Sequence, residues 1–284
     1  MIRIGYLGPE GTFSEKAAQT WRRYVPGPSY LEGKENLPQL FRDLESGKLA
    51  QIIVPVENSI EGSVTVTQDY LISIPGIRVL GEISVAVEHY LVAKTVMPLP
   101  EITAVYSHPQ ALAQCHRFLE QHLPAAQLVQ TASTAEAARL VSEEGRFIAA
   151  ITSLEAAAKY HLAVLAERIQ DFDGNKTRFW ALGPADSAAF PIFDKDRCPW
   201  KTSIVVALPY NRPGGLHMIL TEFANASLDL TRIESRPTKK ELGEYLFIID
   251  FLGHAREETV AGVFENLRAK QVMIKVLGSF PVLA

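Results

Sequence analysis

Residues 126–151 read AQLVQTASTAEAARLVSEEGRFIAAI, and they predict a strand, a helix and a second strand in succession. Two predicted strands, Ala126–Thr131 and Phe147–Ile151, flank a helical pattern over Ala135–Glu144 that Gly145 ends. A helix between two strands of this kind is the unit from which parallel sheets are built. This stretch therefore predicts an α/β fold.

The same alternation extends through residues 1–183. Strands are predicted at Arg3–Leu7, Gln51–Val56 and Ile102–Tyr106, and helices at Glu15–Tyr24 and Gln110–His122. The segment Ile77–Lys94 is too long for one strand and its connection. We expect it to cross between two lobes of one α/β domain.

Residues 201–284 have a different order of elements. The predicted elements are the strand Thr202–Pro209, the helix Pro213–Ala226, the strands Leu228–Ser235 and Gly243–Leu252, the helix Glu257–Lys270 and the strand Val272–Phe280. The order βαββαβ is typical of a ferredoxin-like domain. Residues 184–200 contain three prolines and no sustained periodicity, so they are predicted to link the two domains.

The composition excludes several classes of protein. The net charge of −4, from 28 Lys and Arg against 32 Asp and Glu, argues against a protein that coats nucleic acid. The two cysteines, Cys115 and Cys198, have no metal-ligand spacing, and no apolar stretch reaches the ~18 residues of a membrane span. We expect a cytoplasmic protein with reduced thiols that needs no metal or cofactor and binds neither nucleic acid nor membrane.

Four predicted strand-to-helix junctions carry Ser, Thr or Asn. Thr12, Ser107 and Ser133 begin the pattern S/T-x-x-E/Q of a capping box, and Asn58-Ser59 follows a fourth strand. Each box alone indicates only a stable helix. Because helix N-termini present free N–H groups at the carboxyl ends of strands, the set predicts a pocket for a small anion.

The segment DFDGNKTRF, residues 171–179, is the last polar cluster before the linker. If residues 177–180 form a strand, Thr177 and Phe179 share one face and Arg178 points the other way.

The segment GPEGTFS at 8–14 departs from the G-x-G-x-x-G pattern, which argues against a dinucleotide site.

Four segments together resemble the signature of the prephenate dehydratase family. They are GPEGTFS at 8–14, VPVENSIEGSV at 54–64, SHPQALAQC at 107–115 and NKTRF at 175–179. In the last domain, ESRP at 234–237 followed by GEY at 243–245 resembles the regulatory ACT domain of the same enzymes. The resemblance implies a two-lobed catalytic domain similar to periplasmic binding proteins, which converts prephenate to phenylpyruvate, water and carbon dioxide.

The resemblance also implies which residues act. It assigns catalysis to Thr177, Asn58 and Gln114, and substrate binding to Thr12, Ser14, Ser59, Ser107, Arg178 and Phe179. The Thr177 hydroxyl would hydrogen-bond the departing hydroxyl of the substrate. For Arg178 two alternatives are open, a contact with a substrate carboxylate or a structural ion pair. Glu57 is either a general acid or a carboxylate with a structural partner.

For the ACT domain, the resemblance implies that L-phenylalanine binds between copies of a homodimer or homotetramer and inhibits the enzyme. The effector residues would be Gly214, Gly215, Leu216, Glu234, Ser235, Arg236 and Pro237. Gly215 stands where the family usually has alanine, and His217 departs from the pattern as well. Two other functions are compatible with the motifs: an arogenate dehydratase and a non-catalytic amino-acid sensor.

Overall fold

The structure is a computed structural model, and it describes residues 1–144, 146–185, 198–208, 213–238 and 244–283. The chain forms two compact units, which we describe separately. Unit 1 comprises residues 1–23, 27–67 and 84–179, and unit 2 comprises residues 24–26, 68–83 and 180–284. Most of the predicted linker, residues 186–197, lies outside the described residues, as do Gly145, Pro209 and Gly243.

Unit 1 begins with a parallel sheet, the first lobe. Its strands are β1 (Ile2–Leu7), β2 (Ser29–Lys34) and β3 (Gln51–Asn58), in the order β2-β1-β3, and the short β4 (Gly62–Ser63) pairs antiparallel with β3. Helices α1 (Phe13–Arg22) and α2 (Leu37–Glu45) pack on this sheet. Neither β2 nor α2 was predicted from the sequence; β2 is a partly exposed strand with few apolar residues.

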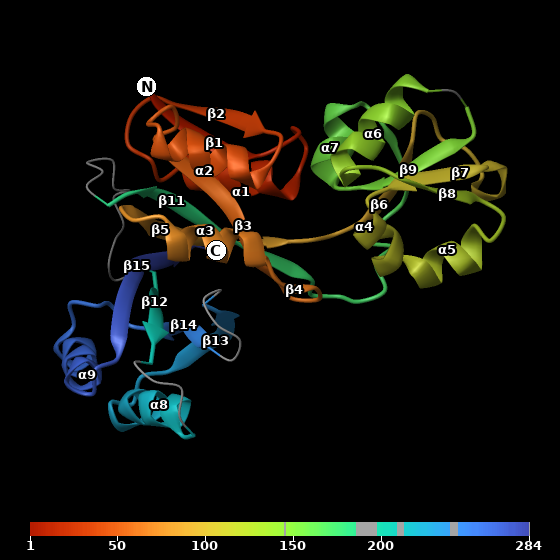
Figure 1. Ribbon diagram of the computed structural model, residues 1–284. Helices are drawn as coiled ribbons and strands as arrows, with labels where there is room; N and C mark the ends of the chain where they lie inside the picture. Colours follow the sequence, from red (N-terminus) through yellow and green to blue (C-terminus); the bar gives the residue numbers. More distant parts are fainter. Residues whose placement is uncertain (145, 186–197, 209–212, 239–243, 284) are drawn as a thin grey trace. The chain divides into compact units, whose positions relative to one another are not determined.

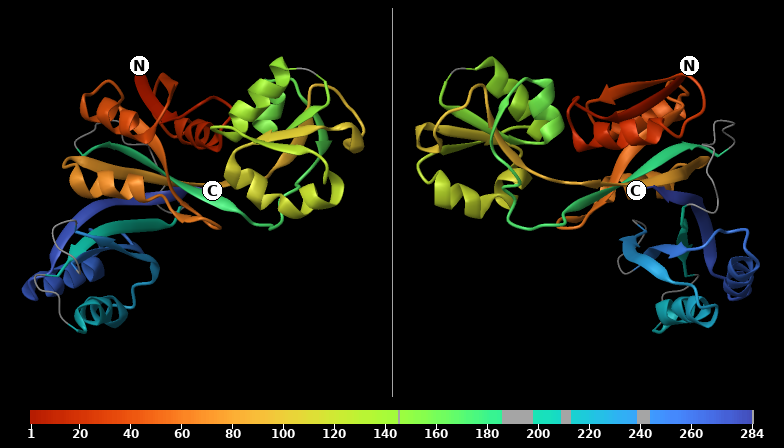
Figure 2. Two further views of the ribbon diagram at one scale, coloured as in Figure 1. Left: turned by 45° about the vertical axis from the view of Figure 1, so that its right-hand side comes forward. Right: turned by 180° about the vertical axis from the view of Figure 1, so that it is seen from behind.

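The second lobe of unit 1 is a five-stranded sheet in the order β10-β6-β9-β7-β8. Its strands are β6 (Tyr90–Ala93), β7 (Ala104–Ser107), β8 (Gln127–Gln130), β9 (Ile148–Thr152) and β10 (Ala163–Ala166). Helices α6 (Thr134–Glu143) and α7 (Leu154–Lys159) cover one face, and α4 (Pro109–Gln114) and α5 (His116–His122) cover the other (Figures 1 and 2). The α/β prediction from residues 126–151 is confirmed.

Two extended segments connect the lobes. β5 (Ile77–Ala86) leads through residues 87–89 into β6 of the second sheet, and β11 (Lys176–Pro184) carries the chain back. The crossings are bonded to each other, since Val87 N–H donates to the Asn175 carbonyl at 2.8 Å and Ile169 N–H to the His89 carbonyl at 2.9 Å. The expectation that Ile77–Lys94 crosses between lobes is therefore confirmed.

The predicted helix Gln110–His122 is wrong in one respect, because it is broken at Cys115 into α4 and α5. The Gln114 carbonyl accepts a hydrogen bond from Asp171 N–H at 2.7 Å, and the Asp171 carboxylate accepts from Arg117 N–H at 3.1 Å. Asp171 therefore replaces intrahelical bonds at the break. The helical periodicity contains no signal of this distant partner.

Unit 2 contains the predicted βαββαβ order. Its elements are β12 (Trp200–Ala207), α8 (Gly215–Asn225), β13 (Leu230–Pro237), β14 (Tyr245–Leu252), α9 (Glu258–Ala269) and β15 (Met273–Leu283). The strands are antiparallel in the order β13-β14-β12-β15, and both helices pack on one face of the sheet (Figure 1). This is the ferredoxin-like arrangement.

The last strand of unit 2 extends beyond this domain. β15 pairs in parallel with β5, with Val282 opposite Glu82. Glu82 is 1% exposed, and its carboxylate accepts from Lys201 Nζ at 2.7 Å and from Trp180 Nε1 at 3.1 Å. Helix α3 (Thr65–Ser73) ends in the same unit, where Lys275 Nζ donates to the carbonyls of Leu71 and Ile72 at 2.8 and 2.9 Å.

Candidate active site

A cavity of about 380 Å³ lies in unit 1 and is lined from both lobes. Its walls are the ends of strands and the starts of the helices that follow them. Lining residues include Thr12, Phe13, Ser14, Asn58, His89, His108, Gln114, Ser133, Thr134, Thr177 and Phe179. This placement matches the sequence-based expectation that polar strand ends meet in one pocket.

Asn58, at the end of β3, has both ends of its amide in use. Its Oδ1 accepts from the N–H groups of Ile60 and Glu61 at 3.0 and 3.1 Å, which forms the turn into β4. Its Nδ2 donates to Thr177 Oγ1 at 2.9 Å and to Asn175 Oδ1 at 2.8 Å. The backbone partners fix which end of the amide donates. This junction is a turn between strands, so the prediction of a helix N-terminus after Asn58 is wrong.

Asn175 continues the network into the second lobe. Because its Oδ1 accepts from Asn58, its Nδ2 is the donor, and it reaches Gln114 Oε1 at 3.1 Å. The same Oε1 lies 3.0 Å from His89 Nε2. Gln114 Nε2 is buried and has no hydrogen-bond partner among the described residues, although the residue lines the cavity. A buried amide nitrogen without a partner, on a residue that lines a cavity, is a candidate donor to a ligand.

Thr177 and Phe179 of β11 line the cavity, as the strand alternation predicts. The Thr177 oxygen accepts from Asn58, so its own O–H hydrogen is left to donate. Arg178 is not among the lining residues, and its NH1 donates to Glu57 Oε2 at 2.8 Å. The structure thus contains the structural ion pair that was the alternative for both Arg178 and Glu57.

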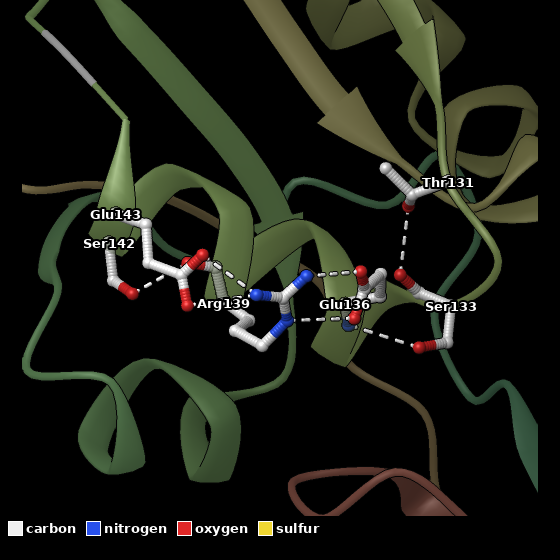
Figure 3. A network of polar contacts seen from close by, with 6 residues as sticks. All are labelled: Thr131, Ser133, Glu136, Arg139, Ser142 and Glu143. Carbon is white, nitrogen blue, oxygen red and sulfur yellow. Dashed lines mark hydrogen bonds and ion pairs between the residues drawn. The ribbon is translucent and has the colours of Figure 1, made fainter.

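Helices α1 and α6 begin at the cavity. The Thr12 hydroxyl accepts from Glu15 N–H at 3.3 Å, and the Ser133 hydroxyl from Glu136 N–H at 3.0 Å. Neither acidic residue completes a capping box. Glu15 accepts instead from Gly11 N–H. Glu136 binds Arg139, which also bridges to Glu143 (Figure 3). Both helices contribute the positive end of their dipoles to the cavity.

Two predicted substrate-binding serines lie elsewhere. Ser107 is fully buried and donates to the Ile151 carbonyl at 2.7 Å. The cap of α4 is His108, whose Nδ1 accepts from Gln110 N–H at 3.3 Å, so the predicted cap at Ser107 is wrong. Ser59 donates to Asn175 Oδ1 at 3.3 Å and accepts from Lys176 N–H at 3.0 Å. Ser59 therefore supports the network from outside the cavity lining.

His89 and Asn175 belong to the site but were not predicted from the sequence. His89 is 2% exposed, and burial lowers the pKa of its ring, although its bond to Gln114 opposes this shift. Asn175 lies two residues before Thr177 within the NKTRF segment. Burial also lowers the pKa of His108, against the charge of Glu61. Groups of residues suited to hold a metal are absent from the described part of the chain.

The predicted effector residues lie in unit 2. Gly214 is the N-cap of α8 with φ +80°, a conformation that favours glycine, and a Cβ on Gly215 would meet Leu208 Cδ1 at 2.4 Å. Glu234 Oε2 on β13 accepts from Gln68 Nε2 of α3 at 2.8 Å, and Arg236 NH2 donates to Asp69 Oδ1 at 2.7 Å.

None of the helices in the described ranges is long and apolar enough to cross a bilayer.

Comparison with known proteins finds a family for each part of the chain. The prephenate dehydratase family matches residues 4–187, and the ACT domain family matches residues 202–269. A prephenate dehydratase of Methanocaldococcus jannaschii is 38% identical over 98% of this chain and 97% of that protein. The structure of an Arthrobacter aurescens prephenate dehydratase in complex with L-Phe superposes with a TM-score of 0.85, at 34% identity over 98% of this chain and 89% of the other.

A protein described as a quorum quenching acylase, GqqA, has a TM-score of 0.83, at 25% identity over 99% of this chain and 98% of the other. The fold is therefore shared by proteins with different activities. The family matches cover the catalytic and regulatory parts alike, and the identity to the archaeal enzyme extends over nearly the full length of both chains. The chain belongs to the prephenate dehydratase family.

Proposed function

We propose that this protein is a prephenate dehydratase that forms phenylpyruvate and is inhibited by L-phenylalanine at its ACT domain. The observation that carries the proposal is a pair of donors on two residues that line the cavity. The Thr177 hydroxyl is held through its oxygen by Asn58, and the Gln114 amide N–H groups are buried without a partner in the described structure. Both suit a substrate that presents oxygen atoms.

The reaction breaks two bonds of the substrate ring. The electrons of the bond to the ring carboxylate move into the ring as carbon dioxide leaves, the ring becomes aromatic, and the hydroxyl opposite departs and takes up a proton to become water. Charge develops on the departing oxygen. The Thr177 O–H donates a hydrogen bond there, and because Asn58 fixes its oxygen in advance, little reorganisation is needed at the moment of reaction.

The two carboxylates of prephenate need positive potential, although residues 1–200 carry 18 Lys and Arg against 23 Asp and Glu. The starts of α1 and α6, at Ser14 and Ser133, line the cavity and supply it locally. Neutral donors of this kind hold the ring carboxylate without the strong stabilisation that a cation would give it before decarboxylation. Arg178 is directed to Glu57 in this proposal.

For regulation, the L-Phe complex of the Arthrobacter aurescens relative supports the effector. Here Glu234 and Arg236 hold the α3 residues Gln68 and Asp69. Helix α3 follows β4, which pairs with Asn58. An effector that contacts β13 would therefore change the contacts of α3, and α3 follows β3 and β4 in the chain. Assembly as a dimer or tetramer, and a location in the cytoplasm, are further parts of this proposal.

One assay separates the candidate functions. The purified protein is incubated separately with prephenate, with arogenate and with an N-acyl amide, and phenylpyruvate, phenylalanine and the free amine are measured with and without added L-phenylalanine. We expect phenylpyruvate from prephenate, with a rate that falls as L-phenylalanine rises. If only arogenate is converted, and the product is phenylalanine, the protein is an arogenate dehydratase. Cleavage of the amide would indicate an acylase. If none of the three compounds yields a product, the protein is a sensor.

A further inference from the structure

His89 lies in the connection between the lobes, and hydrogen bonds hold its backbone in place. Its backbone N–H donates to Gln170 Oε1 at 3.0 Å, and its carbonyl accepts from Ile169 N–H at 2.9 Å. The ring lies edge-on to Phe13, with centroids 6.2 Å apart. With 2% of the residue exposed, the ring is enclosed by its neighbours.

The hydrogen-bond network determines which nitrogen of His89 carries the proton. The turn at Ile60 and Glu61 fixes Asn58 Nδ2 as a donor, so Asn175 Oδ1 accepts and Asn175 Nδ2 donates. Gln114 Oε1, which receives that bond, is therefore an acceptor. His89 Nε2, at 3.0 Å from the same oxygen, must carry hydrogen.

We infer that His89 is a positioning residue: its Nε2–H, together with Asn175, holds the Gln114 carbonyl oxygen and so keeps the Gln114 amide N–H groups on the other side of the amide, available to a ligand. This inference rests on the proposed function. Without the His89 donor, only Asn175 opposes a flip of the Gln114 amide. A flipped amide would present an oxygen to an anionic substrate, which would weaken binding instead of supporting it.

The competing role for His89 is direct proton transfer to or from the substrate. A neutral ring with Nε2 occupied by Gln114 leaves only Nδ1 as an acceptor, and Nδ1 has no hydrogen-bond partner in the described structure. The two roles differ in one respect. A positioning residue acts only through Gln114, whereas a proton-transfer residue contributes whether Gln114 is present or not.

The test uses two amide substitutions of different reach. The amide nitrogen of glutamine can occupy the place of His89 Nε2. The side chain of asparagine is too short to bring its amide nitrogen there. In the full-length protein we expect His89→Asn to lower kcat/KM for prephenate about 10- to 100-fold, and His89→Gln to stay within about threefold of the wild type. Urea unfolding of each variant checks that the fold is retained.

A double-mutant cycle with Gln114→Ala then separates positioning from proton transfer. In the Gln114→Ala background we expect His89→Asn to lower kcat/KM by less than about twofold. A full, additive loss in that background, or an equal loss for His89→Gln and His89→Asn, would overturn the inference. A wild-type protein that leaves prephenate unchanged would instead overturn the proposed function, so the two failures are distinguishable.

Discussion

Asn58 and Thr177 lie on separate strands, 119 positions apart in the sequence, and are joined by a 2.9 Å hydrogen bond from Nδ2 to Oγ1. This bond makes the threonine oxygen an acceptor and leaves its hydrogen to donate. A hydroxyl oriented in this way can stabilise a departing oxygen without giving up its proton.

Thr177→Val removes the hydroxyl and keeps the shape of the side chain. We expect kcat to fall about 100- to 1,000-fold, as for the loss of one preorganised donor, while the unfolding midpoint changes little. Thr177→Ser is the matched control, because it keeps the hydroxyl, and it should retain most of the activity. Steady-state turnover of prephenate measures both. Near-normal turnover by Thr177→Val would contradict the assigned role.

Asn58→Asp keeps the oxygen that accepts from Ile60 and Glu61 but replaces the donor that reaches Thr177 and Asn175. We expect kcat/KM to fall by at least about 100-fold, because the carboxylate would compete for the Thr177 hydrogen and repel an anionic substrate. Asn36→Asp provides a control with the same change of charge, since Asn36 only caps α2 through Oδ1 at 2.9 Å from Gln39 N. Equal losses in both variants would point to a general charge effect.

The lowered pKa of His89 makes stability depend on pH. In the unfolded chain this group takes up a proton near its ordinary pKa of 6.5, whereas the buried ring in the folded protein stays neutral to lower pH. The stability it contributes is therefore present above pH 6.5 and is lost as pH falls toward the folded pKa, with a slope of at most about 1.4 kcal/mol per pH unit. Urea unfolding of the wild type between pH 7.5 and 5.5 should show a steeper decline than that of His89→Gln. Parallel curves would show that another group sets the dependence.

Lys201 and Glu82 form a buried ion pair in unit 2 at 2.7 Å. Lys201→Met would remove this cation from a carboxylate that is 1% exposed, and we expect the free energy of unfolding to fall by about 1.5–3 kcal/mol, as for the loss of a hydrogen bond to a charged group. Adding Glu82→Gln removes the buried negative charge and should recover part of that loss, because the amide oxygen still accepts from Trp180. Urea unfolding measures the series. A double variant less stable than Lys201→Met would argue against this account.

Asp69→Asn tests the proposed route of regulation. The carboxylate of Asp69 accepts from Arg236 at 2.7 Å, so the substitution weakens the tie between α3 and β13 without a change in the cavity lining. We expect the basal rate to stay within about twofold, and the L-phenylalanine concentration for half inhibition to shift at least about threefold. Inhibition curves for wild type and variant provide the measurement. An unchanged curve would mean that the effector acts through other contacts.

Much of this architecture could be predicted from local sequence. Apolar runs gave the central strands, and the Thr12 and Ser133 patterns marked the starts of α1 and α6, because the signals for strands and caps extend over a few neighbouring residues. Strand alternation alone separated Thr177 and Phe179 from Arg178.

The remaining features depend on partners far apart in the sequence. The break at Cys115 follows from Asp171, and the cap of α4 at His108 becomes possible because the Ile151 carbonyl engages Ser107. His89 has no motif around it, and its role depends on a glutamine 25 positions later. The pairing of β15 with β5 likewise joins segments that share no local pattern.

The two bonded crossings between the lobes have a mechanical consequence. Val87 and Asn175 are joined there by a backbone hydrogen bond, and Asn58, Thr177, His89 and Gln114 are linked to the same place. In a rotation of one rigid body on another, displacement grows with distance from the axis. A hinge at the crossings would leave the polar network almost stationary, while the N-terminal ends of α1 and α6 would move farther. The chemistry could then stay assembled through every cycle of entry and release.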